Sequence, residues 1–360
     1  MRIAQIAPLA EAVPPRLYGG TERVIWWLTE ALVDLGHQVT LFASGDSVTS
    51  GRLVSCAESG LRLAGVGDHT AHTLVMLDRV LRRSGEFDIL HFHIDLHQFP
   101  LFRHLSSKCL TTLHGRQDLA DVWPIYRAFP EMNLVSISDD QRRPIAGANF
   151  VATVHHGLPT NLIPYSPAPG SPDGDEYLAF VGRISPEKRP DRAIEIARRA
   201  GLRLKVAAKV DPADELYFRE RIAPLLDDPL IEYVGEIGDR DKAAFLGGAL
   251  ALLFPIDWPE PFGLAMIEAM AAGTPVIAWR NGSVPEVIEQ GRSGFIVNSV
   301  EEAVAAVDAA RLLPRSGVRD RFEARFTADR MASDYLAVYR SLLAGRREPR
   351  RARGELVGAG

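Results

Sequence analysis

Two glutamates, Glu260 and Glu268, stand eight positions apart in the otherwise apolar segment WPEPFGLAMIEAM. A carboxylate that is buried among apolar side chains without a partner costs free energy, so each glutamate must either reach water or hold another group. Pro261 and Gly263 place the expected start of a helix near Phe262. The first glutamate then precedes the helix, and the second lies inside it.

The separation of the two glutamates limits the chemistry that they can share. Eight helical residues rise by ~12 Å and turn by a net ~80°, which puts both carboxylates on roughly one side, at opposite ends of a long ligand. A retaining glycosidase needs two carboxyl groups only ~5 Å apart, so this spacing is too wide for one. The unpaired amides of Gly263 and Leu264 could receive a phosphate between the glutamates. By itself, the spacing also fits a surface helix with both side chains in water.

Two cations follow a predicted core strand in the segment VGRISPEKRP. Arg183 leaves the end of the strand and Lys188 comes five residues later, so both would converge on one loop. A forked guanidinium and a compact ammonium group are the usual pair for a diphosphate. The pattern favours a diphosphate site over the alternative, which is a solvated turn with two basic residues.

The length and composition of the chain restrict the class of protein. A chain of 360 residues suggests two domains, because single cores stop growing near ~250–300 residues. Its net charge of −5 gives no overall attraction for nucleic acid or anionic lipid. The start is unlike a signal peptide and no apolar run approaches the ~20 residues that span a bilayer, so we expect a cytoplasmic protein. Cys56 and Cys109 lack metal-ligand or redox spacing and are expected to be reduced thiols.

Short apolar runs alternate with amphipathic segments along the sequence, which is typical of parallel doubly wound sheets. In the first half the runs predict strands at 2–7, 38–43, 87–92, 109–114 and 133–138, with helices at 21–35 and near 70–83. In the second half they predict strands at 177–182, 202–208, 230–235, 251–255 and 275–279, with a helix near 190–200.

A Pro-rich segment at 157–176 separates the two halves and is predicted to be a linker. We therefore expect Rossmann-like domains at 1–156 and 177–327. A helix at 328–344 would follow and can return to the N-terminal domain, and the Arg- and Gly-rich stretch 345–360 is expected to be a disordered tail. For that tail, a peripheral membrane or partner contact is the alternative. Two such domains place a ligand cleft between the carboxyl ends of their strands.

Motifs spread over nearly the whole chain carry a family resemblance. The pairs Gly182-Arg183 and Glu187-Lys188 are followed by EPFGLAMIEAMAAGTPVIAWRNGSVPEVI. The first half adds YGGTERV, HFH, TLHG, SISDDQR and HHGLP. Together these segments resemble the family 4 retaining glycosyltransferases of the GT-B fold. The resemblance implies an α/β architecture in which an acceptor-side N-terminal domain faces a nucleotide-sugar-binding C-terminal domain.

The resemblance also implies how a donor would be bound. Glu268 would bind the ribose hydroxyls of a sugar nucleotide, and Glu260 would hold a hydroxyl of the transferred sugar. Arg183 and Lys188 would neutralise the departing diphosphate in place of a metal ion. Backbone contacts to sugar and phosphate are implied for Phe262, Gly263 and Leu264, and base recognition is implied near Gly235 and Ile237.

Two glycines of the first strand–helix loop, Gly19 and Gly20, fit a place where the backbone must approach a phosphate closely, although an ordinary turn is the alternative. Two positions depart from the family pattern. Ser283 stands where a second glycine is more common. Lys209 replaces a usual glycine and would add positive charge near the nucleotide.

Histidines end several strands of the first half. His114 resembles the family histidine that sits over the reacting sugar, with a packed strand-end histidine as the alternative. We expect His91, His93 and Asp95 to lie on the acceptor side. Imidazoles two positions apart share one face of a strand, so a metal site with His97 is a less favoured alternative, and surface solvation is the alternative for Asp95.

The sequence thus predicts a retaining hexosyltransferase that moves a sugar from a nucleoside diphosphate sugar, with a UDP-sugar expected, to a hydroxyl acceptor. Neither a metal ion nor a cofactor is expected, and the partners would be the donor and an acceptor rather than nucleic acid. A nucleotide-sugar epimerase or a phosphorylase of related fold is one alternative. A non-catalytic nucleotide-sugar-binding protein is another.

Overall fold

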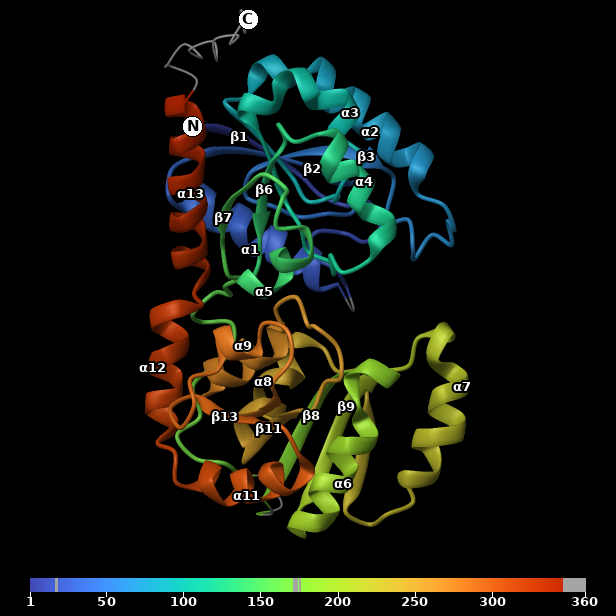
Figure 1. Ribbon diagram of the computed structural model, residues 1–360, viewed down its shortest axis with the longest axis vertical. Helices are drawn as coiled ribbons and strands as arrows, with labels where there is room; N and C mark the ends of the chain where they lie inside the picture. Colours follow the sequence, from blue (N-terminus) through green and yellow to red (C-terminus); the bar gives the residue numbers. More distant parts are fainter. Residues whose placement is uncertain (17–18, 171–173, 175, 346–360) are drawn as a thin grey trace, which may run out of the picture.

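The computed structural model describes residues 1–16, 19–170, 174 and 176–345, which form two α/β domains stacked end to end (Figure 1). The first domain is built on a parallel sheet with the strand order β3-β2-β1-β4-β5-β6-β7. Its strands are β1 (Arg2–Ile6), β2 (Gln38–Ser44), β3 (Arg52–Ala57), β4 (Ile89–Phe92), β5 (Cys109–Thr112), β6 (Asn133–Ser136) and β7 (Phe150–Thr153). Its helices are α1 (Gly20–Asp34), α2 (Thr70–Arg82), α3 (Phe99–Phe102), α4 (Trp123–Ala128) and α5 (Asp139–Arg142).

The second domain repeats this architecture with a parallel sheet of order β10-β9-β8-β11-β12-β13. Its strands are β8 (Tyr177–Arg183), β9 (Arg203–Lys209), β10 (Ile231–Gly235), β11 (Ala251–Phe254), β12 (Val276–Trp279) and β13 (Gly294–Val297). Its helices are α6 (Pro190–Ala200), α7 (Glu215–Tyr217), α8 (Asp239–Gly248), α9 (Leu264–Ala272), α10 (Val284–Val287), α11 (Val300–Arg311) and α12 (Arg315–Arg325). The predicted pair of doubly wound α/β domains is confirmed.

Three strands that the sequence did not reveal, β3, β7 and β13, lie at sheet edges. No residue of β3 or β7 is fully buried. Because an edge strand is covered on fewer sides than a central one, it does not need the continuous apolar run that marks a buried parallel strand. The predicted strands appear at the expected positions, and they are central in their sheets except for β10, which lies at an edge.

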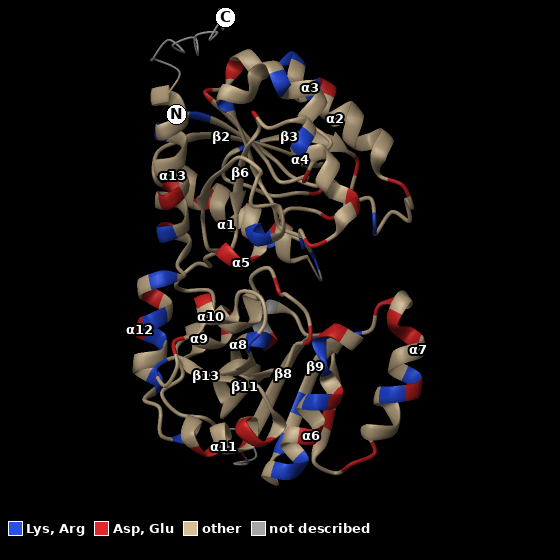
Figure 2. Cartoon of the chain, viewed as in Figure 1, with Lys and Arg blue, Asp and Glu red and all other residues tan. Residues whose placement is uncertain are grey.

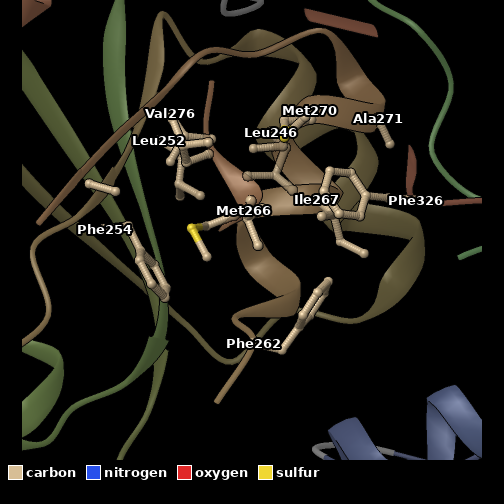
Figure 3. Packing of buried hydrophobic residues seen from close by; sticks show 14 of the residues in the cluster. Leu246, Leu252, Phe254, Phe262, Met266, Ile267, Met270, Ala271, Val276 and Phe326 are labelled. Atoms are coloured by element: carbon tan, nitrogen blue, oxygen red, sulfur yellow. The ribbon is translucent and has the colours of Figure 1, made fainter. Parts of the chain in front are cut away.

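Helix α9 forms the centre of the second domain (Figure 3). Apart from Glu268, its side chains are apolar all around the helix, and such helices are buried rather than amphipathic. Figure 3 shows its Met266, Ile267 and Met270 packed against side chains from the neighbouring strands and helices, among them Leu246, Leu252, Val276 and Phe326. Every α9 residue from Met266 to Ala272 is buried, Glu268 included. The alternative of a surface helix is therefore wrong.

The chain passes between the domains twice, and the two passes are joined. Leu158 donates its amide to the Phe326 carbonyl at 3.0 Å and accepts the Ala328 amide at 2.9 Å. A Cβ on Gly157 would stand 2.1 Å from the Thr327 carbonyl oxygen, so only glycine allows this approach. The predicted linker lies between β7 and β8, and its residues 171–173 and 175 are outside the described residues, as is the predicted tail beyond 345.

Helix α13 (Ala328–Gly345) follows the second crossing and runs along the N-terminal domain (Figure 1). Its Tyr335 and Tyr339 are fully buried there. The Tyr335 hydroxyl is 2.8 Å from Thr112 Oγ1, and the Tyr339 hydroxyl is 2.7 Å from His91 Nδ1. The last helix is thus packed into the core of the first domain.

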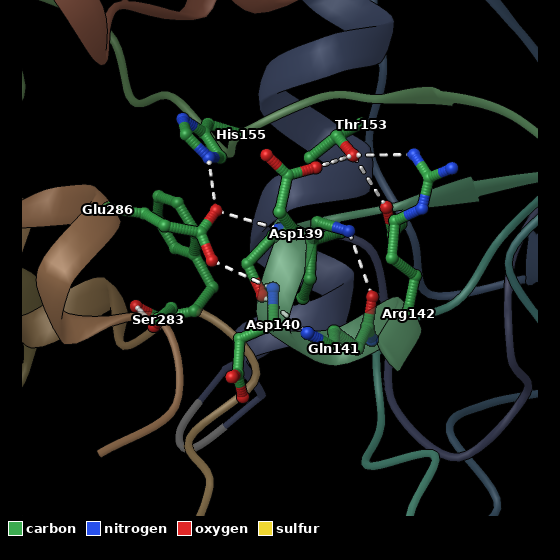
Figure 4. A network of polar contacts seen from close by, with 12 residues as sticks. Asp139, Asp140, Gln141, Arg142, Thr153, His155, Ser283 and Glu286 are labelled. Atoms are coloured by element: carbon green, nitrogen blue, oxygen red, sulfur yellow. Dashed lines mark hydrogen bonds and ion pairs between the residues drawn. The ribbon is translucent and has the colours of Figure 1, made fainter. Parts of the chain in front are cut away.

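A polar network also links the two domains (Figure 4). Glu286, in α10 of the second domain, accepts the amides of Asp139 and Asp140 at 2.7 and 2.8 Å, at the start of α5 in the first. It also lies 3.1 Å from His155 Nε2. Burial would raise the pKa of Glu286, but the hydrogen bonds from His155 and the two amides outweigh burial and lower it. The carboxylate therefore stays ionised across this contact.

Two further expectations concern cysteines and membranes. Cys56 and Cys109 are free thiols, as predicted. Among the residues that the structure describes, no helix has the length and apolar character that a membrane span requires.

Candidate active site between the two domains

A pocket of about 650 Å³ lies between the carboxyl ends of the two sheets. The first domain contributes residues that include Gly20, His114, Arg116 and His156. The second contributes residues that include Arg183, Lys188, Lys209, Glu260, Gly263 and Glu268. Figure 2 shows basic and acidic residues next to each other at the end of β9 that faces the N-terminal domain. The cleft expected from the strand pattern is therefore present, with charged side chains in its wall.

The loop before α9 is shaped by Gly263. Its φ of +82° is in the left-handed region, and a Cβ there would lie 2.7 Å from Met266 Cε and 3.1 Å from Phe254 Cζ. Gly263 is the N-cap, so α9 begins at Leu264 rather than near Phe262 as predicted. Phe262, Gly263 and Leu264 all line the pocket. The amides at this helix start are the groups that an anion would use.

Glu260 lies in the pocket wall with its carboxylate held on one side. It is 9% exposed, and its Oε2 accepts hydrogen bonds from Lys188 Nζ and, at 3.1 Å, from Trp258 Nε1. The Lys188 ammonium also lies 4.8 Å from the centroid of the Trp258 ring. The glutamate and the lysine were predicted from the sequence, but their pairing and the contact with Trp258 were not.

Glu268 has a different cation. It is 4% exposed, and its Oε1 is 2.8 Å from Nζ of Lys242 on α8. Lys242 lines the pocket as well. No sequence pattern predicted this lysine as a site residue, although it follows the segment Gly235–Ile237 in which base contacts were expected. Each of the two glutamates is therefore ion-paired with a lysine, so neither carboxylate is buried without a partner.

Arg183 and Lys209 share a set of carboxylates at the ends of β8 and β9. Arg183 pairs with Glu187 at 2.8 Å and lies 3.5 Å from Asp211 and 3.7 Å from Asp214. Lys209 pairs with Asp211 at 2.8 Å. Burial raises the pKa of Asp211, but Lys209 and Arg183 more than offset this and lower it. The alternative of a freely solvated basic turn is wrong, because these side chains form an ordered network at the pocket.

Two imidazoles meet at the pocket. His114 and His156 stack with ring centroids 5.3 Å apart and planes 21° apart, and Phe262 meets His156 edge-on at 5.0 Å. Burial lowers the pKa of His114 to about 3, so its ring is neutral at any ordinary pH. His156 lies in the motif HHGLP, but no sequence pattern predicted a role for it. The stack joins the first domain to the aromatic side chain beside Glu260.

The acceptor-side prediction is wrong for His91 and His93. Both are buried beneath the pocket rather than part of its wall. His91 lies between the Tyr339 hydroxyl at 2.7 Å and Thr112 Oγ1 at 2.8 Å. His93 lies between His114 Nε2 at 2.9 Å and Gln5 Oε1 at 2.7 Å. The two positions share one strand face, as predicted, but α13 covers that face.

Asp95 is exposed in the loop after β4, where its φ is +56°, and it is not part of the pocket wall. This exposure agrees with the alternative of surface solvation, and the predicted place of Asp95 on the acceptor side stays a prediction. Among the described residues, no group of three His, Cys, Asp or Glu side chains is arranged to hold a metal ion.

The predicted glycines have different places. Gly20 lines the pocket, and a Cβ there would lie 3.4 Å from Leu264 Cδ1 in the other domain. Gly19 also lines it, and a Cβ there would lie 2.8 Å from Pro15 Cβ. Gly235 is not part of the pocket wall. Its φ of +76° turns the chain, and Ile237, two residues later, lines the pocket. Base recognition near Gly235 and Ile237 stays a prediction.

Ser283, one of the two departures from the family pattern, supports the Glu260 loop. Its amide donates to the Glu260 carbonyl at 3.0 Å, and its hydroxyl donates to the Phe262 carbonyl at 2.8 Å. The side chain is fully buried. A serine here therefore adds a hydrogen bond to the loop rather than disturbing it.

Gly282 supports the same loop and gives a first testable prediction. Its φ is +54°, and a Cβ there would lie 2.3 Å from Glu260 N and 2.4 Å from Glu260 O. We expect Gly282→Ala to lower turnover by roughly 10- to 100-fold, because a displacement of about 1 Å at a reacting centre costs that much. The matched control is Gly291→Ala, whose φ is +70° but whose Cβ would have no heavy atom of the described residues within 4 Å.

Thermal unfolding and transfer rates of both alanine variants test this prediction. The control should show only the conformational cost of a left-handed alanine, about 1–2 kcal/mol, with a near-normal rate. Equal loss of rate in the two variants would contradict a specific role for Gly282.

The comparisons with known proteins agree with this geometry. Residues 18–137 match the family described as Glycosyltransferase Family 4, and residues 164–325 match the family described as Glycosyl transferases group 1. A D-inositol 3-phosphate glycosyltransferase of Salinispora arenicola is 33% identical over 190 residues, which are 47% of this chain and 42% of the relative. The match thus spans less than half of that relative.

Two other similarities extend over nearly the full length. A phosphatidyl-myo-inositol mannosyltransferase of Mycobacterium leprae is 26% identical over 377 residues, which cover 95% of this chain and 97% of the relative. The crystal structure of Anabaena Alr3699/HepE in complex with UDP and glucose superposes with a TM-score of 0.71 at 15% identity, over 95% of this chain and 100% of that one. Two family matches in consecutive halves, on two facing parallel sheets, show that the chain belongs to the family 4 glycosyltransferases of the GT-B fold.

Proposed function

We propose that the protein is a retaining glycosyltransferase that moves a sugar from a nucleoside diphosphate sugar, with UDP as the nucleotide, to a hydroxyl acceptor. The observation that carries this proposal is the pair of buried glutamates in one interdomain pocket, each ion-paired with a lysine. Carboxylates that are ion-paired in this way are strong acceptors for hydroxyl groups. Glu268 would bind the ribose, and Glu260 a hydroxyl of the transferred sugar.

The cations of the pocket would act on the leaving group. When the bond between sugar and phosphate breaks, negative charge grows on the diphosphate, and positively charged groups that are already in place stabilise it. Arg183 and Lys188 line the pocket together with the helix start at Gly263. The positive end of the α9 dipole adds to their effect. We propose that these groups do the work of a metal ion.

The choice of UDP rests on similarity of fold. Alr3699/HepE, which shares the fold, was crystallised with UDP and glucose. In this chain, Ile237 and the neighbouring backbone line the part of the pocket proposed for the base. A thermal-shift screen against UDP, GDP, ADP and dTDP tests the nucleotide, because a ligand at 100 times its Kd stabilises the fold by ~2.7 kcal/mol.

The reaction itself is tested by supplying UDP-sugars with a panel of hydroxyl acceptors. We expect a product whose anomeric configuration, read by NMR, is that of the donor sugar. Formation of an epimer of the donor would indicate the epimerase alternative. Binding of the nucleotide without turnover of any donor would indicate a binding protein.

The metal requirement gives a second prediction. We expect the transfer rate to stay within about twofold of its starting value after EDTA treatment, because the proposed charge stabilisation comes from side chains and a helix start. The measurement is the initial rate with and without chelator, followed by addition of magnesium or manganese. Loss of activity in EDTA that either metal restores would overturn this part of the proposal.

A further inference from the structure

The carboxylate of Glu260 is engaged on one oxygen only. Lys188 Nζ and Trp258 Nε1 both donate to Oε2, the indole at 3.1 Å. No hydrogen bond from the described residues reaches Oε1, which is not among the buried atoms left without a partner. Because a carboxylate oxygen has two lone pairs, two donors on Oε2 satisfy it and leave Oε1 open to the pocket.

The indole of Trp258 is held in place from several directions. The backbone carbonyl of Trp258 accepts a hydrogen bond from the Glu260 amide at 2.8 Å. The Lys188 ammonium lies 4.8 Å from its ring centroid, and the Arg116 guanidinium of the other domain lies 5.7 Å from it. Arg116 is itself fixed by two hydrogen bonds of 2.6 Å to Asp118. Cation–π contacts of this kind favour one orientation of the ring.

We propose that Trp258 is a positioning residue that fixes the Glu260 carboxylate, so that Oε1 faces the pocket and accepts a hydroxyl of the substrate. The indole N–H is the neutral donor on Oε2, and it sets the rotation of the carboxylate about its last bond. Arg116 reaches this indole from the N-terminal domain, so a residue of the other domain also supports the orientation of Glu260. The role in sugar transfer rests on the proposed function, whereas the hydrogen bond itself does not.

Two substitutions separate the hydrogen bond from the ring. Trp258→Phe keeps an aromatic face for Lys188 and Arg116 but removes the N–H donor, and Trp258→Leu removes both. If the ring were only an apolar wall, Trp258→Phe would be nearly neutral. The matched control is Trp279→Phe, because Trp279 lies in the same domain under Arg192, at 4.6 Å, and is not part of the pocket wall.

The kinetic test is a double-mutant cycle between Trp258 and Glu260. We expect Trp258→Phe to lower kcat about 10-fold, as loss of a hydrogen bond to a charged group does, with KM for the donor and Kd for UDP changed less than about twofold. In the Glu260→Ala background the same substitution should cause no further loss, because the indole acts through the carboxylate. A normal kcat in Trp258→Phe, or equal losses in the two backgrounds, would overturn the proposal.

A spectroscopic test does not depend on activity. The chain has five tryptophans, so selective ¹⁵N labelling gives five indole N–H signals, and Trp258→Phe identifies the one of interest. We expect that signal to be shifted downfield and slow to exchange, and to lose both properties in Glu260→Ala but not in Trp279→Phe. A signal that Glu260→Ala leaves unchanged would overturn the positioning role. If the signal behaves as expected but no donor is turned over, the proposed function fails and the contact stands.

Discussion

Replacing Lys188 with alanine is expected to lower the rate of sugar transfer by roughly 10- to 100-fold or more, and Arg183→Ala should do the same. A hydrogen bond to a charged group contributes about 1.5–3 kcal/mol, and about 1.4 kcal/mol is tenfold in rate. Lys188→Ala would also leave Glu260 without its ammonium partner. Arg183→Ala would remove the cation that Glu187, Asp211 and Asp214 share.

The control for these variants is Lys205→Ala. Lys205 resembles Lys188 in lying near a carboxylate, Glu232 at 3.4 Å, and over an aromatic ring, Tyr177 at 4.7 Å. It is not part of the pocket wall. Initial rates at saturating donor should therefore fall in the two pocket variants and stay near normal in the control. Near-normal rates in both pocket variants would mean that these cations do not stabilise the leaving group.

The second large effect is a division of labour between the two glutamates. We expect Glu268→Ala to raise the Kd for UDP at least about 10-fold, because a charged partner of the ribose is lost. Glu260→Ala should change this Kd by less than about threefold but lower kcat at least about 10-fold. The structure supplies a reason for the difference. Glu260 holds the ammonium group of Lys188, and in Glu260→Ala this group would be available to bind the diphosphate.

Calorimetry with UDP and initial-rate measurements check this division. Glu289→Ala is the control, since Glu289 pairs with Arg325 at 2.9 Å and is not part of the pocket wall. The thermal unfolding of each variant should also be measured, because Glu268→Ala removes the ion pair with Lys242 on α8 and so can lower the stability of the fold. Equal losses of UDP affinity in the two pocket variants would sink the assignment of separate roles.

The sequence predicted the fold well where periodicity reports burial. Central strands such as β4 and β11 are covered on both faces, so their residues form apolar runs that predict a strand. The edge strand β3 has no fully buried residue and gave no such signal. The start of α9 was misplaced by two residues, because Gly263 is the N-cap of the helix and has a left-handed backbone conformation. Glycine allows this conformation but does not require it.

The candidate site was predicted unevenly for a related reason. Arg183 and Lys209 end neighbouring strands, and Glu260 precedes a helix. Local strand–helix geometry therefore already brings them to the carboxyl end of the second sheet. His91 and His93 also stand near a strand end, yet they are buried. Their alternation predicted which face they share. It could not predict what covers that face.

By itself, the sequence determined two α/β domains, the family, and the side chains that the second domain offers at its strand ends. These features depend on residue type and on neighbours a few positions away, which the sequence displays directly. Only the tertiary structure decided the partners: Lys188 with Glu260, Lys242 with Glu268, and α13 over His91. Such contacts join residues far apart in the chain, and they follow from sheet order and from the return of α13 to the first domain. No local pattern encodes that geometry. A pattern can predict that a charged side chain is buried and therefore needs a partner, but it does not specify which residue the partner is.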